Sequence, residues 1–151
     1  MRNWTATTIA ILALCVSIYQ ICAAQRNARI NLAIDISTKN LSGEIAALRN
    51  GFIDFHRHDR TPENERAANA FIFYLDYVAR LIKEERIERN YVSYSVQWQI
   101  CAIFQEVYRD DFPADRKNAL PRESEVKALE DFYEQNKDSV CPAQTIMDLN
   151  L

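Results

Sequence analysis

Both histidines of this chain lie in one short stretch, Asp54-Phe55-His56-Arg57-His58-Asp59-Arg60. Imidazole and carboxylate groups bind metal ions and transfer protons, so the stretch is a candidate for chemistry. On an α-helix, His56 and His58 point about 200° apart and diverge; they converge only in an irregular turn, with Asp54 or Asp59 as a further ligand. The simpler interpretation is the polar end of a helix, where His and Arg complement the negative end of the dipole. We favour the helix end and keep a metal or enzyme site at His56 and His58 as the alternative, because the spacing matches no recognised ligand geometry.

The rest of the chain carries no familiar catalytic motif. GxSxG, P-loop, HExxH and glycine-rich phosphate-binding patterns are all absent from the sequence. Asp76 lies within an apolar helical pattern, where we expect it to pair with Arg80 four residues later. We therefore predict a protein without enzyme activity, cofactor or bound metal.

An uncharged segment near the N-terminus is the strongest signal in the sequence. Residues 3–25 carry no charge, and a helix of that length rises roughly 34 Å, enough to cross a hydrocarbon core of about 30 Å. We predict a transmembrane anchor at 1–25, with the lipid bilayer as its first partner. Its expected membrane residues are Trp4, Ile9, Leu12, Leu14, Val16, Ile18, Tyr19 and Ile21.

The same segment also fits a secretory signal peptide. Arg2 is a minimal positive n-region, and Cys22-Ala23-Ala24 before Gln25 resembles a cleavage site. Cleavage after Ala24 would release an exported, soluble helical protein. We favour the anchor, because the apolar run is long for a signal peptide.

Flanking charges and cysteines bear on which side of the membrane the rest of the chain lies. Arg26 and Arg29 follow the apolar run, whereas Arg2 and the terminal amine precede it, so the positive-inside tendency predicts a cytoplasmic domain by a narrow margin. Cys101 and Cys141 are plain thiols there, or a disulfide if the domain is exported.

Helical periodicity dominates after the anchor. Residues 26–42 read as a juxtamembrane helix and turn, although their alternating pattern also fits a strand. Residues 43–137 form the predicted bundle, and 138–151 a tail. The helices of the bundle are expected at 43–57, 61–85, 88–109 and from Pro121 to about Lys137. The chain is thus predicted to be all-α, with one N-terminal transmembrane helix followed by a small antiparallel bundle of about four helices.

Charge and aromatic content indicate what kind of partner to expect. A net charge of −3 with mixed signs argues against nucleic acid as a partner. If the aromatic residues of the third bundle helix are exposed, they offer a surface for a protein partner. These residues are Tyr91, Tyr94, Trp98 and Tyr108. We predict an adaptor or accessory subunit that binds a membrane-protein partner or forms a homo-oligomer.

The stretch Tyr74-Leu75-Asp76-Tyr77-Val78-Ala79, with Leu81-Ile82-Lys83 and Ile87-Glu88, resembles an uncharacterised family of small bacterial single-pass membrane proteins with a domain of unknown function. The chain departs from that pattern at Phe73, where the family carries Asn, and at Glu85, where it carries Gly. The resemblance implies an anchor in a bacterial inner membrane and a short helical domain, and it implies no reaction.

Overall fold

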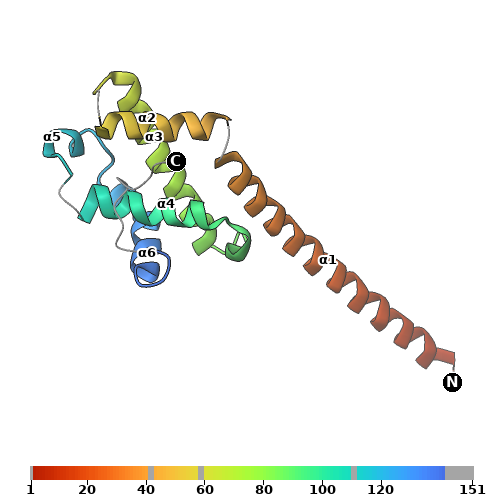
Figure 1. Ribbon diagram of the computed structural model, residues 1–151. Helices are drawn as coiled ribbons and strands as arrows, with labels where there is room; N and C mark the ends of the chain where they lie inside the picture. The colour runs from red at the N-terminus through yellow and green to blue at the C-terminus, as the bar shows by residue number, and fades with distance from the viewer. Residues whose placement is uncertain (1, 41–42, 58–59, 110–111, 142–151) are drawn as a thin grey trace.

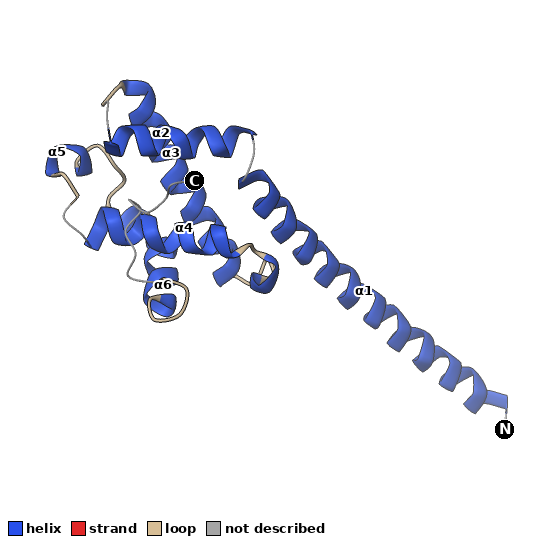
Figure 2. Ribbon diagram, viewed as in Figure 1, coloured by secondary structure: helices blue, strands red, loops and turns tan. Residues whose placement is uncertain are grey.

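A computed structural model describes residues 2–40, 43–57, 60–109 and 112–141, with side chains described from Ile9 onward. Every regular element in these ranges is helical (Figure 2). A long N-terminal helix leads into a group of shorter helices that pack around one core (Figure 1). The predicted all-α class and helical bundle are confirmed.

Helix α1, Arg2–Asn40, runs for 39 residues without interruption. Residues 2–25 of the predicted anchor and 26–40 of the juxtamembrane segment are therefore parts of one helix, and the strand alternative for 26–40 is wrong. Figure 1 shows α1 leaving the other helices as an isolated rod, with its N-terminal end far from them. The helix can extend there because it contains neither Gly nor Pro.

The bundle contains four longer helices and several short ones. Thr61 caps α3 by accepting a hydrogen bond from the backbone of Asn64, and Pro62 occupies its first turn, so the helix begins where the sequence predicts it. The bounds of the longer helices are α2 Gly43–Arg57, α3 Pro62–Lys83, α4 Tyr94–Phe104 and α6 Lys127–Asn136. The short elements are η1 Arg89–Tyr91, the π-helical η2 Gln105–Arg109, α5 Ala114–Lys117 and η3 Glu123–Glu125.

Two predicted helices begin later than the apolar periodicity indicated. The helix expected at 88–109 starts at Tyr94, because the hydroxyl of Ser93 accepts the backbone N–H of Val96 and caps it there. The last helix starts at Lys127 rather than near Pro121, and a 3-10 turn precedes it. At α4, local capping thus overrides the longer apolar pattern.

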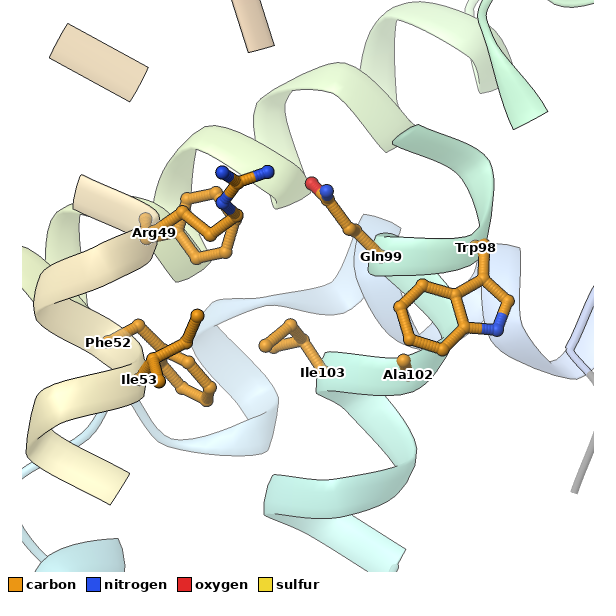
Figure 3. Close-up of a pocket in the computed structure, with 8 residues that line it drawn as sticks. Arg49, Phe52, Ile53, Trp98, Gln99, Ala102 and Ile103 are labelled. Carbon is orange, nitrogen blue, oxygen red and sulfur yellow. The ribbon is translucent and has the colours of Figure 1, made fainter. Parts of the chain in front are cut away.

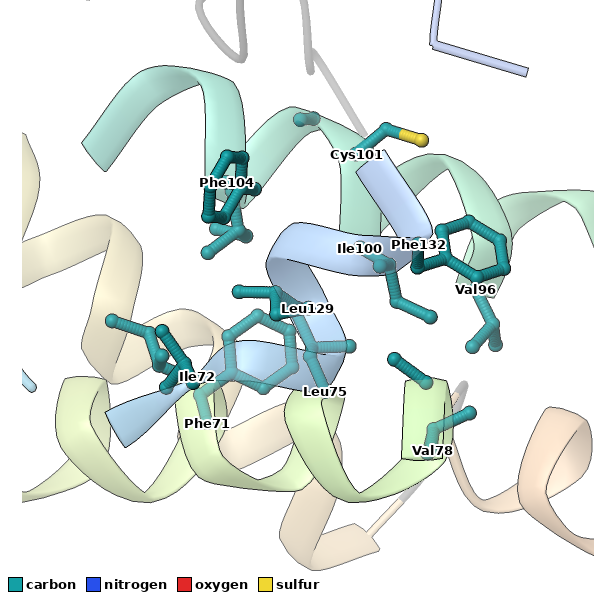
Figure 4. Packing of buried hydrophobic residues seen from close by; sticks show 14 of the residues in the cluster. Phe71, Ile72, Leu75, Val78, Val96, Ile100, Cys101, Phe104, Leu129 and Phe132 are labelled. Carbon is teal, nitrogen blue, oxygen red and sulfur yellow. The ribbon is translucent and has the colours of Figure 1, made fainter. Parts of the chain in front are cut away.

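The core forms where α3, α4 and α6 meet (Figure 4). Phe71 and Leu75 of α3 face Ile100 of α4 and Leu129 of α6, and all four side chains are buried. Their apolar spacing is what predicted these helices.

Gly51 lets α2 approach α3 closely. A Cβ atom built at Gly51 would lie 2.4 Å from the Cβ of Ala67, which has no rotamer through which to move away. The glycine that weakens α2 by sequence propensity is therefore required by packing.

We expect Gly51→Ala to destabilise the bundle, although alanine is the better helix former. The overlap should cost about 1–3 kcal/mol, against a propensity gain of about 1 kcal/mol. Urea unfolding of the full chain in mild detergent measures the difference. Adding Ala67→Gly should restore part of the loss, and a single variant more stable than the wild type would contradict the steric argument.

A buried carboxylate joins α3 to α6. Asp76 is 3% exposed, and its Oδ1 accepts the backbone N–H of Leu129 at 3.0 Å. Its Oδ2 accepts from Arg80 at 2.9 Å, the pairing expected from the sequence. Because Leu129 lies in the first turn of α6, Asp76 satisfies one of the N–H groups that this helix leaves unbonded.

A disulfide between Cys101 and Cys141 ties the described C-terminal end to α4. Both cysteines are buried, so residues 138–141 of the predicted tail belong to the packed bundle. The remainder of that tail, 142–151, lies outside the described residues.

Candidate functional site

The outer part of α1 exposes apolar side chains on all of its faces. Between Ile9 and Ile21 every large apolar residue is at least half exposed, which includes seven of the predicted membrane residues. The side chain of the eighth, Trp4, lies outside the described set. Over Ile9–Asn40 the helix is long and apolar enough to cross a membrane, and a signal sequence near an N-terminus meets the same criterion.

The inner end of α1 is held by the bundle. Ala33 and Ile36 are buried in the core. Asn40 is fully buried and donates to the side-chain oxygen of Gln99 on α4 at 3.0 Å. Ser37 accepts the backbone N–H of Ser93 at 2.8 Å, just before α4 begins. Helix α1 is therefore packed and hydrogen-bonded to the bundle along its last two turns.

Tyr74 of α3 adds to this junction. Its hydroxyl donates to the carbonyl of Ile36 at 3.5 Å. Burial, and secondarily the carboxylate of Asp35 on α1, raise the pKa of Tyr74 to about 12. The phenol therefore remains neutral and able to donate across the physiological pH range.

The histidine stretch provides a buried contact between a histidine and an acid that the sequence did not indicate. His56 lies in the last turn of α2, as the helix-end interpretation predicts. Its Nε2 lies 2.9 Å from Oε1 of Glu106 on η2, and both side chains are about nine-tenths buried. Nothing in the sequence indicates this contact, because local spacing does not connect residues that lie 50 positions apart.

Neighbouring groups close this pair off from solvent. The rings of Phe112 and His56 have centroids 5.1 Å apart. Arg116 donates to the carbonyls of Phe55 and His56 at the end of α2. This arrangement joins the helix end to the segment that follows α4, so it serves the packing of the bundle.

No third metal-ligating side chain joins this pair within the described ranges. In those ranges no group of three or more His, Cys, Asp or Glu side chains is placed to hold a metal ion. The other members of the stretch, His58 and Asp59, lie outside the described residues. The metal alternative at His56 and His58 therefore gains no support from the geometry.

An apolar cavity lies between α2, α3 and α4, with Phe52, Ile53, Trp98 and Ile103 among its walls (Figure 3). Its volume is about 20 Å³, room for about one water molecule. A cavity of this size is a packing gap rather than a ligand site.

The four aromatic residues predicted as a partner surface separate in the fold. Tyr91 and Tyr94 are 45% and 62% exposed, and Trp98 is partly buried against the core. Tyr108 is 8% exposed and donates to the carbonyl of Pro121 at 2.7 Å, so it does not belong to an open surface. Burial raises the pKa of its phenol.

Two exposed aromatic residues on α3, Phe73 and Tyr77, were not part of the predicted surface. They stand four residues apart on one face of the helix. The apolar pattern of α3 gave no reason to separate them from the core side of the helix.

Comparisons with protein-family models, curated protein sequences and solved structures find no match to this chain. The resemblance to an uncharacterised membrane-protein family stays a prediction.

Proposed function

We propose that this chain is a non-enzymatic, single-pass membrane protein whose bundle binds a protein partner at the membrane surface, as an adaptor or accessory subunit of a larger membrane complex. The observation that carries the proposal is the contrast within α1. Its outer part exposes apolar side chains on all sides, whereas Ala33, Ile36 and Asn40 are buried in the bundle. Such an apolar rod is stable in a bilayer and costly in water.

The disulfide supports a bundle that lies outside the cytoplasm. Disulfides persist in oxidising compartments and are rare where thiols are kept reduced. The opposite, cytoplasmic placement comes from a nearly even count of positive charges around the apolar run, so the Cys101–Cys141 pair carries more weight. In a bacterial inner membrane, as the resemblance implies, the disulfide favours a bundle in the periplasm.

Exposed aromatic side chains support a protein partner for the bundle. Tyr91 belongs to η1, which contacts the inner end of α1. Tyr94 begins α4, the next element along the chain. Tyrosine is enriched at protein interfaces, because it supplies apolar area and a hydrogen-bonding group together. A partner that shares the membrane would meet these residues beside the anchor.

Native purification in mild detergent, followed by mass spectrometry, tests the proposal. We expect an intact chain that still contains α1 and a second polypeptide at fixed stoichiometry. Tyr91→Ser with Tyr94→Ser should release that polypeptide. The matched variant Phe73→Ser with Tyr77→Ser, on exposed residues of α3, should retain it.

A chain that begins at Gln25 and fractionates with soluble protein would reject the anchor and establish the exported alternative. A full-length chain that elutes alone and monomeric would reject the adaptor role while leaving the anchor intact.

A further inference from the structure

A second cavity lies where α1 meets the turn between α3 and α4. Its volume is about 460 Å³, within the range of small-ligand sites. It is lined by Arg29 of α1, by Glu85, Glu88 and Arg89 of the connection between α3 and α4, and by residues of α3 and α6. The site therefore exists only because the membrane helix passes the bundle here.

The charges in this cavity do not compensate one another. Within the described ranges, the side chains of Arg29, Glu85 and Glu88 form no ion pair or hydrogen bond. Arg89 donates to the neutral side-chain oxygens of Gln97 and Asn136, so its positive charge has no carboxylate partner.

Lys83, the third cation that lines the cavity, differs from Arg29 and Arg89. Lys83 donates to Asp131 at 2.7 Å and is already paired. Two guanidinium groups and two carboxylates thus line one space, and within the described residues none of the four is in an ion pair. A ligand that carries both a negative and a positive group satisfies all four.

The position of Arg29 on α1 sets the depth of the cavity in a membrane. The uncharged run ends at Gln25, four residues before Arg29, which is a rise of roughly 6 Å. The polar layer on each side of the hydrocarbon core is about 5–8 Å thick. When α1 crosses the bilayer along its normal, the cavity lies among phospholipid headgroups.

We propose that this cavity binds the headgroup of a phosphatidylethanolamine-type lipid, an inference that rests on the proposed membrane anchorage of α1. The lipid phosphate accepts hydrogen bonds from Arg29 and Arg89, since guanidinium groups match phosphate geometry. The primary ammonium donates to the carboxylates of Glu85 and Glu88. An anionic headgroup without an amine leaves both glutamates uncompensated, and choline has no N–H to donate.

Glu85 provides a sharp test of the site because of its backbone. Its φ is +54°, the left-handed region that residues with a side chain avoid and that glycine adopts readily. Glu85→Gly therefore removes the carboxylate and also removes the steric cost of the left-handed backbone conformation. We expect the variant to melt at the same temperature as the wild type or higher, so a loss of lipid binding cannot be attributed to unfolding.

The experiment titrates the full-length protein, in mild detergent, with three phospholipids of identical acyl chains: phosphatidylethanolamine, phosphatidylcholine and phosphatidylglycerol. Native mass spectrometry counts the lipid bound per chain. We expect one phosphatidylethanolamine per chain, with an affinity about tenfold above the other two, as charge-assisted hydrogen bonds predict. Glu85→Gly and Arg29→Gln should abolish this preference. Glu84→Gln, a change at an exposed neighbour outside the cavity, should leave it unchanged.

Equal binding of the three lipids, tightest binding of phosphatidylglycerol, or an unchanged preference in Arg29→Gln would each overturn the proposal. Failure of the anchor is a separate result, because the intact mass then begins at Gln25. That released chain still contains all four charged residues and can be titrated with soluble glycerophosphoethanolamine. Binding that is lost in Glu85→Gly supports the headgroup site without the anchor, and no binding overturns it.

Discussion

Loss of the Cys101–Cys141 disulfide is expected to destabilise the bundle by about 4 kcal/mol. The bond closes a loop with a sequence separation of 40 residues, and the chain-entropy model gives this magnitude for a loop of that length. Both cysteines are buried, and the bond fixes the end of the described chain to α4. Urea unfolding of full-length protein in mild detergent, with and without reductant, measures the loss, and Cys141→Ser should match the reduced wild type.

The other two cysteines of the chain supply the control. Cys15 and Cys22 are free and exposed on the outer part of α1, so their replacement by serine should leave the unfolding midpoint unchanged.

Alkylation of cysteine thiols before cell lysis also reports the compartment in which the bundle lies. If Cys101 and Cys141 both react in intact cells without reductant, the bond is absent in the cell, and the bundle lies in a reducing compartment.

Asp76→Ala should cost about 2–3 kcal/mol of unfolding free energy. The substitution removes the cap of α6 and leaves the N–H of Leu129 buried without an acceptor, which costs about 1–3 kcal/mol. It also removes the carboxylate partner of Arg80, a pair worth up to about 1 kcal/mol. Asp76→Asn retains an oxygen that can accept from Leu129, so the expected loss is smaller. The same urea titration, followed by fluorescence of Trp98, resolves the two variants.

Asp131→Asn is the matched control for Asp76. Asp131 is also a carboxylate paired to a base, Lys83, but that pair is exposed, and such pairs contribute less than about 1 kcal/mol. The hydrogen bond from Lys83 lowers the pKa of Asp131, while burial opposes this shift. If Asp76→Ala costs no more than Asp131→Asn, then α6 does not depend on its cap from α3.

The sequence predicts the helices well where apolar spacing and a local cap agree. Thr61 and Pro62 mark the start of α3, and the spacing of Phe52 and Phe55 identifies the buried face of α2. These features are local, so a single segment contains all the information needed. The uncharged run that became the outer part of α1 is predictable for the same reason.

Long-range contacts were not predictable, and they decide the candidate sites. The partner of His56 is Glu106, and the second partner of Asp76 is the backbone of Leu129. Neither pairing can be predicted from local residue spacing, because both depend on how the helices pack against one another. The lipid site combines Arg29 with a turn more than 50 residues later, which only the docking of α1 brings together.

The continuity of α1 has a mechanical consequence. A helix of 39 residues is roughly 58 Å long, and its last two turns are fixed to α4 by Asn40 and Ser37. There is no flexible joint between its outer part and its docked part, so a change in tilt of the outer part rotates the bundle by the same angle. In a bilayer whose thickness changes the tilt of α1, the bundle rotates with it. The exposed side chains of Tyr91 and Tyr94 then change their orientation relative to the membrane plane.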